Sequence, residues 1–208
     1  SYGDDVIFTT SCIAPSVSAS SNSPVCEGST IQLSGGPEGM SSYSWTGPAG
    51  FSSPSRNATI DDATQAMEGT YNLTVTDSNG CTNTASTYVT VKASPIATAS
   101  SNSPVCEGST IQLSGGPEGM SSYSWTGPAG FNKDSRNATI DDATQAMEGT
   151  YTLTVTGPNS CTDTASTYVT VKASPIATAS SNYPVCEGST IQLSGGPEGM
   201  SSYSWTGP

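Results

Sequence analysis

An 80-residue internal repeat constrains the fold of this chain more than any other feature of its sequence. Cysteine and tryptophan recur at that spacing, at Cys26, Cys106 and Cys186 and at Trp45, Trp125 and Trp205. The segment from Ser23 to Phe51 returns unchanged from Ser103 to Phe131. A unit of this length is large enough to be a small domain with its own core. We therefore expect an extension over 1–16, complete repeats over 17–92 and 93–172, and a partial repeat over 173–208.

The two complete copies differ mainly where turns are expected. The run 52–54 is Ser-Ser-Pro in the first copy and Asn-Lys-Asp in the second, and the run 77–80 is replaced by Gly-Pro-Asn-Ser. Substitutions concentrated in turns indicate that the rest is one folding unit copied whole.

Alternating apolar and polar residues predict short strands, at 17–25, 30–34, 42–46, 58–60, 70–76 and 84–91 in the first unit. The alternation turns Tyr71, Leu73 and Val75 inward and Asn72 outward. Short strands at this spacing are typical of a two-sheet sandwich. The predicted fold class is all-β, with tandem immunoglobulin-like sandwiches. Its expected core residues are Leu33, Trp45, Tyr71, Leu73, Trp125, Tyr151 and Trp205.

Three segments of the unit resemble landmarks of immunoglobulin-like domains. Residues 27–33 look like the start of strand B, Trp45 stands where that fold keeps its strand C tryptophan, and Tyr71 resembles the tyrosine-corner residue before strand F. The whole unit is similar to the Ig-like and PKD-like repeats of bacterial and archaeal surface proteins. It departs from antibody domains at the positions of the core disulfide, which are Gly35 and Leu73, so that Trp45 packs on aliphatic side chains instead.

Composition excludes several classes of partner. The net charge is −12 with only five Lys and Arg, which cannot neutralise a nucleic-acid backbone and disfavours an anionic membrane surface. No apolar run approaches the roughly 18 residues of a membrane span. Six cysteines without any histidine fit disulfides in an oxidising compartment better than zinc. We expect an extracellular or cell-surface protein.

The cysteines allow two pairings. In an immunoglobulin-like topology Cys26 lies at the A–B end of the sandwich and Cys81 at the opposite F–G end, too far apart for a bridge that needs Cα atoms within about 7 Å. Cys26 would then pair with Cys161, and Cys12 with Cys81, across the joints between domains. The alternative is the within-domain set, Cys26–Cys81 and Cys106–Cys161. The disulfide candidates are Cys12, Cys26, Cys81, Cys106, Cys161 and Cys186.

Two sets of polar residues are candidate sites. Asp61, Asp62, Asp141 and Asp142 are weak calcium candidates, but they match no fixed calcium-binding spacing, and solvated acidic turns are the favoured interpretation. No cofactor is expected. Asn57, Asn72 and Asn137 each begin an N-glycosylation sequon.

Catalysis is not expected. The chain has no histidine base, no Ser-x-x-Lys pattern and no glycine-rich phosphate loop. Tyr43 and Trp45 face inward by the alternation and are predicted to belong to the core rather than to a sugar-binding platform.

The partial third repeat supplies only strands A, B and C, which would leave a core face uncovered. Either the sequence is a window cut from a longer array, or another chain completes the half-domain. Residues 5–10 read as a lone strand, a possible donor for head-to-tail assembly by β-strand addition.

Three functions fit these observations. The favoured one is a structural repeat of an extracellular filament or surface stalk, because copying a unit adds length without adding chemistry. The first alternative is an adhesin module that binds glycans or a protein through its end loops. The second is a set of accessory domains of a larger secreted protein.

Overall fold

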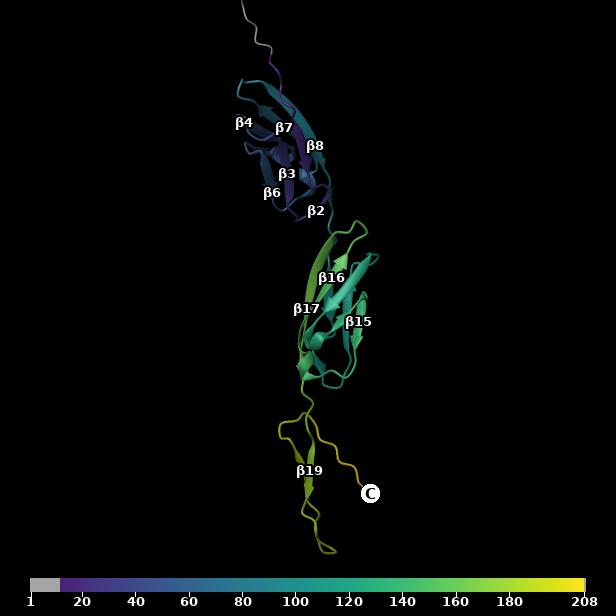
Figure 1. Cartoon of the computed structure of the whole chain (residues 1–208). Coiled ribbons are helices and arrows are strands. Elements are labelled where there is room, and N and C mark those ends of the chain that lie inside the picture. The colour runs from purple at the N-terminus through teal and green to yellow at the C-terminus, as the bar shows by residue number, and fades with distance from the viewer. Residues whose placement is uncertain (1–11, 208) are drawn as a thin grey trace, which may run out of the picture. The chain divides into compact units, whose positions relative to one another are not determined.

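The computed structural model describes residues 12–207 and consists almost entirely of β-strands and turns (Figure 1). The described residues separate into two compact units. One contains residues 12–97, 117–123 and 154–164, and the other contains 98–116, 124–153 and 165–207. The first unit therefore holds the whole first repeat together with one end of the second. The strand expected over residues 5–10 lies outside the described residues.

The first repeat folds as a two-sheet sandwich. Its strands are β1 (Ser18–Ser21), β2 (Val25–Cys26), β3 (Ile31–Gly36), β4 (Ser42–Thr46), β5 (Ser52–Ser53), β6 (Asn57–Ile60), β7 (Gly69–Thr76), β8 (Thr82–Val89) and β9 (Val91–Lys92). One sheet has the order β1-β3-β6, the other has the order β5-β4-β7-β8, and β2 pairs with β9 in parallel. Single 3-10 turns lie at η1 (Pro48–Gly50) and η2 (Gln65–Met67). This is an all-β immunoglobulin-like arrangement.

Trp45 is the centre of the core between the two sheets. Its side chain is fully buried, and the indole Nε1 donates a hydrogen bond to the carbonyl of Arg56 at 3.0 Å. Leu33 and Leu73 pack in the same cluster. A Cβ added at Gly35 would lie 2.5 Å from Leu73 Cδ2, so the glycine makes room for the leucine and the indole. Gly35 and Leu73 thus face each other where antibody domains place their core disulfide.

Tyr71 forms the tyrosine corner. Its ring is fully buried, and its hydroxyl donates a hydrogen bond to the carbonyl of Met67, four residues upstream, at 2.8 Å. Burial raises the pKa of this phenol above its ordinary value. Phe51 packs edge-on against the ring, with centroids 5.6 Å apart. Tyr151 repeats the hydrogen bond to Met147 in the second repeat.

The second repeat copies this plan. Its elements are β10 (Thr98–Ser101), β11 (Val105–Cys106), β12 (Ile111–Gly116), β13 (Ser122–Thr126), β14 (Asn132–Lys133), β15 (Asn137–Ile140), β16 (Gly149–Thr156), β17 (Thr162–Val169), β18 (Val171–Lys172), η3 (Pro128–Gly130) and η4 (Gln145–Met147). Trp125, Tyr151 and Leu153 are fully buried in its core.

The first and last predicted strands of the unit are each two strands in the structure. The expected strand 17–25 is divided into β1, which pairs with β3, and β2, which pairs with β9. Pro24 lies at the break, and since proline has no N–H, it cannot continue the ladder with β3. The expected strand 84–91 is likewise divided, at Thr90, whose N–H donates to Ser23 Oγ at 2.8 Å.

The third repeat is less ordered than predicted. Only β19 (Thr178–Ser181) and β20 (Leu193–Gly196) form, as one antiparallel pair (Figure 1). The strand C expected near Tyr203 is absent, because the described residues contain no neighbour to pair with it. Trp205, expected in a core, is 46% exposed, since no opposite sheet covers it within residues 12–207.

Candidate functional site

A disulfide connects the two complete repeats. Cys26 at the end of β2 is bonded to Cys161, which precedes β17, with Cα atoms 5.6 Å apart. The parallel pairing of β2 with β9 sets Cys26 beside Lys92, where the chain leaves the first repeat. Both cysteines belong to the same compact unit. The structure thus contains the inter-domain pairing, and the within-domain alternative Cys26–Cys81 is not formed.

Hydrogen bonds surround this disulfide. The amide of Asn159 donates to the carbonyl of Ala93 at 2.7 Å, and Lys92 Nζ donates to the carbonyl of Asn159 at 3.3 Å. The backbone N–H of Ala97 donates to Asp163 Oδ2 at 2.8 Å. We call this set, residues 26–27, 92–97 and 159–163, the inter-repeat joint. The bonds of Asn159 to Ala93 and of Asp163 to Ala97 fix both ends of the short segment between β9 and β10.

The first repeat contributes its own half of the joint. Ser94 donates from its backbone N–H to Glu27 Oε2 at 3.3 Å and from its hydroxyl to the Glu27 carbonyl at 3.1 Å. These bonds hold the segment after β9 against the turn after β2. Sequence patterns gave Glu27, Asn159 and Asp163 no role in this joint, because their hydrogen-bond partners lie 66 or 67 residues away in the chain.

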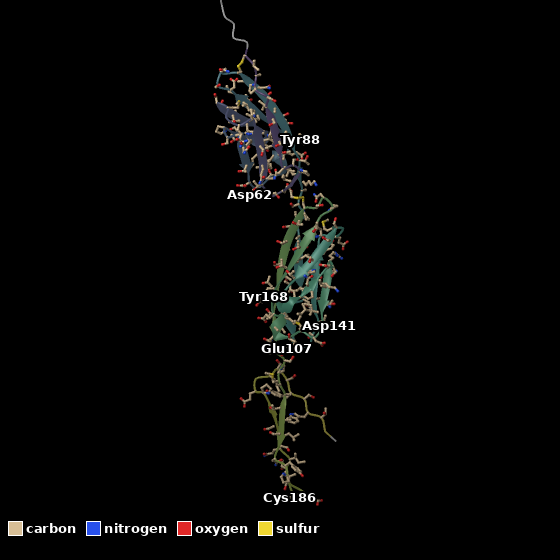
Figure 2. All side chains as sticks on the ribbon, viewed as in Figure 1. Asp62, Tyr88, Glu107, Asp141, Tyr168 and Cys186 are labelled. Carbon is tan, nitrogen blue, oxygen red and sulfur yellow. A yellow bond between two sulfur atoms is a disulfide. The ribbon has the colours of Figure 1, made fainter. Side chains whose placement is uncertain are left out.

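A second disulfide joins Cys12 to Cys81, with Cα atoms 5.7 Å apart. Cys81 directly precedes β8, just as Cys161 directly precedes β17. Cys12 is therefore bonded to Cys81 in the same way that Cys26 is bonded to Cys161. Nearby, the Asn83 amide donates to the Pro15 carbonyl at 2.8 Å. The remaining cysteines, Cys106 and Cys186, are exposed thiols. Cys186 is labelled in Figure 2.

Two of the four acidic candidates, Asp61 and Asp141, accept hydrogen bonds in turns. Asp61 Oδ1 accepts from the Thr30 hydroxyl at 2.8 Å, and Asp141 does the same with Thr110. Asp62 and Asp142 are the next residues in the same turns, which follow β6 and β15. Figure 2 labels Asp62 in the first turn and Asp141 in the second. Within residues 12–207, no three acidic or cysteine side chains are grouped so that they could hold a metal ion. The absence of any cofactor stays a prediction.

All three sequon asparagines are exposed. Asn72 lies on the outer face of β7, opposite Thr46 on β4 and Ser86 on β8. Asn57 and Asn137 lie on β6 and β15, at the edges of their sheets, and each side-chain oxygen accepts a backbone N–H, from Gly35 and Gly115 respectively.

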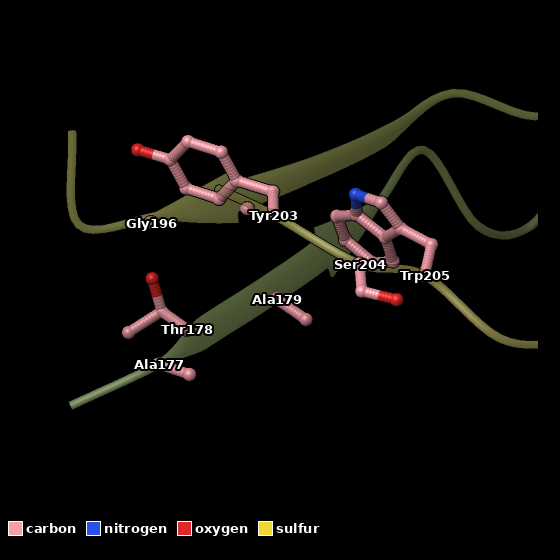
Figure 3. A pocket seen from close by; sticks show the side chains of 8 residues that line it. Ala177, Thr178, Ala179, Gly196, Tyr203, Ser204 and Trp205 are labelled. Carbon is pink, nitrogen blue, oxygen red and sulfur yellow. The ribbon is translucent and has the colours of Figure 1, made fainter. Parts of the chain in front are cut away.

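The third repeat contains a hollow of about 200 Å³ lined by Ala177, Ala179, Gly196, Tyr203 and Trp205 (Figure 3). The equivalent residues of the first repeat include Trp45, which is fully buried between two sheets. The hollow is therefore the inner face of a strand pair, not a ligand pocket. The hydroxyl of Tyr203, one of the lining residues, donates a hydrogen bond to the Pro197 carbonyl at 2.6 Å.

The two complete sandwiches define a class of protein, that of tandem immunoglobulin-like domains. A model of the PKD-like domain family matches residues 13–91 and again residues 92–171. The chain belongs to the PKD-like domain family. Domains of this kind are typically non-catalytic structural or adhesion modules, and together with the disulfides they indicate an extracellular or secreted protein. Among the described residues, no helix is long and apolar enough to cross a membrane.

Among solved structures, the chain is similar to parts of several distant proteins. Three N-terminal domains of the outer capsid protein Hoc of bacteriophage RB49 are 20% identical, with a TM-score of 0.38, covering 91% of this chain and 71% of that one. Murine CEACAM1b is 12% identical, with a TM-score of 0.36, covering 75% and 100%. The amphioxus IgVJ-C2 molecule is 19% identical, with a TM-score of 0.33, covering 69% and 97%. No curated protein matches the sequence.

Proposed function

We propose that this chain is a non-catalytic structural module of an extracellular filament or cell-surface stalk. The observation that carries the proposal is the disulfide between Cys26 and Cys161, which connects successive repeats at their joint. A covalent bond across a joint resists separation of the two domains by tension. It adds nothing to ligand recognition or to chemistry.

The burial of the aromatic side chains and the short connection between the complete repeats support the same role. The large aromatic residues Trp45, Tyr71, Trp125 and Tyr151 are all fully buried in the cores. Only five residues separate the end of β9 from the start of β10, and the joint hydrogen bonds hold them at both ends. A segment this short and this well bonded leaves little slack for a flexible linker. Self-association into a head-to-tail fibre, or continuation of a longer array, is the partner that this role implies.

Glycans are a second component of the proposal. Asn72 is the best placed of the three sequons, because its outward position between polar residues on the face of a sheet leaves room for a sugar. We expect an intact mass above the sequence mass, and a substitution Asn72→Gln should remove the largest part of the excess. An intact mass equal to that of the sequence would contradict glycosylation at all three positions.

Immunoelectron microscopy of native material tests the structural role. An antibody raised against the two complete repeats is expected to label filaments or stalks at intervals along their length. Preimmune antibody on the same grids is the control. Labelling confined to globular soluble particles would contradict the proposal and favour the accessory-domain alternative.

A further inference from the structure

Cys106 occupies in the second repeat the position that Cys26 occupies in the first. It ends β11, which pairs in parallel with β18 in the register Cys106 opposite Lys172, as Cys26 pairs opposite Lys92. The backbone around it is held in the same way. The Glu107 N–H donates to the Lys172 carbonyl at 2.9 Å, and the Glu27 N–H makes the same bond to Lys92 at 2.9 Å.

The segment after β18 is already arranged as in the closed joint. Ser174 donates from its N–H to Glu107 Oε2 at 3.1 Å and from its hydroxyl to the Glu107 carbonyl at 3.3 Å. These are the bonds that Ser94 makes to Glu27 in the inter-repeat joint. One half of a second joint is therefore formed, with its thiol in place.

The surface around Cys106 is open where the surface around Cys26 is covered. Cys26, Lys92, Ser94, Pro95 and Ala97 are all partly buried in the joint with the second repeat. Their counterparts in the second repeat are all exposed within residues 12–207, and they are Cys106, Lys172, Ser174, Pro175 and Ala177. This difference in exposure arises because the F–G end around Asn159, Cys161 and Asp163 covers the residues of the first set, and nothing among residues 12–207 covers the second set in the same way.

We propose that Cys106 and this open surface bind the F–G end of another copy of the repeat and form a disulfide with its cysteine. The incoming loop needs the Cys that precedes its last long strand, an Asn two residues before it and an Asp or Asn two residues after it. Both Cys81 and Cys161 stand in such loops. The inference goes beyond the proposed function, because an array that never forms a filament would be cross-linked in the same way.

The bond forms by oxidation of two thiols. Each thiol loses one proton and one electron, and a small disulfide such as oxidised glutathione accepts both electrons and both protons and becomes two thiols. The docked loop brings the two sulfur atoms together before the exchange. Docking is what separates this reaction from random oxidation of an exposed cysteine.

The variant Cys12→Ser of the full chain tests the proposal, because it frees Cys81 on the F–G end of the first repeat. In glutathione buffer we expect a ladder of disulfide-linked multimers on non-reducing gels. Peptide mapping should find Cys81 bonded to Cys106 in about tenfold or greater excess over Cys81 bonded to Cys186, because docking raises the local concentration of the correct thiol. Cys186 is the matched internal control, since the strand that would frame it does not form among the described residues.

Two double variants complete the experiment. C12S/C106S should lose about nine tenths or more of the multimers, whereas C12S/C186S should form the same ladder as C12S. The proposal would be overturned if the C12S chain stayed monomeric. It would also be overturned if Cys81 were bonded to Cys106 and to Cys186 in equal amounts. Circular dichroism of each variant identifies any loss of fold. The structural role is tested separately, by the search for filaments in native material. A negative result with the C12S variants would therefore contradict this inference but not the proposed structural role.

Discussion

Single residues decide how each sandwich closes. Gly35 allows Leu73 and the indole of Trp45 to approach strand β3 closely, and any side chain at residue 35 would also meet the Arg56 carbonyl. That carbonyl accepts the only N–H of the Trp45 ring, so the buried indole leaves no polar atom unsatisfied. The core therefore needs no internal disulfide, and the cysteines are available for the joints.

Tyr71 gives a prediction of alkaline sensitivity. Because burial raises its pKa in the folded state above that of the unfolded chain, the folded state holds the phenolic proton more tightly. This contribution to stability is complete below the unfolded pKa of about 10 and is lost as the pH rises through the folded pKa. Tyr71→Phe should lose about 1 kcal/mol at pH 8, from the missing hydrogen bond to Met67.

Denaturant unfolding at pH 8 and at pH 11 measures this effect. Tyr151 adds the same dependence in the second repeat, so the double variant Y71F/Y151F should lose much less stability between the two pH values than the unaltered chain. Tyr88→Phe is the control, because Tyr88 is exposed. An equal loss in the double variant and the unaltered chain would show that other groups cause the alkaline effect.

At the scale of elements, long alternating strands could be predicted and strand breaks could not. The alternation over 70–76 gave β7 to within one residue, because each buried side chain faces the same core. The division of 17–25 into β1 and β2 depends on which sheet accepts each half, and that is a tertiary contact. Strand β5 has only two residues and carries no periodic signal. Strand C of the third repeat was expected because its sequence is that of β4, yet a strand also needs a paired neighbour.

The joint was predictable only in part. The sandwich topology places Cys26 and Cys81 at opposite ends, and this separation favours the pairing that the structure contains without excluding the other. The hydrogen bonds of Asn159 and Asp163 were not predictable, since both reach backbone atoms about 66 residues away. The repeat period and the alternation of apolar and polar residues predict structure within one segment of the chain. The joint, in contrast, is formed by residues that are distant in sequence.

At the scale of the whole molecule, the disulfides change the path by which tension travels. The bond from Cys26 to Cys161 has a sequence separation of 135, and the chain between those residues is bypassed. The bond from Cys12 to Cys81 has a separation of 69 and overlaps the first. In a longer array whose repeats are all complete and all bridged in this way, the shortest covalent path would cross only the 25-residue spacing from Cys161 to Cys186 between one bridge and the next. Such a path extends by about 90 Å for every two repeats, against about 560 Å without bridges.

Single-molecule stretching of the existing chain, held near residue 12 and residue 207, tests this topology. Reduction with a phosphine should release about 470 Å of contour length that the oxidised chain hides behind the bond from Cys26 to Cys161. In the control Cys26→Ser, only the bond from Cys12 to Cys81 remains, and reduction should release about 240 Å. Within-domain bridges would instead release their length in two equal steps. That pattern, or no difference on reduction, would show that tension does not pass through the joint.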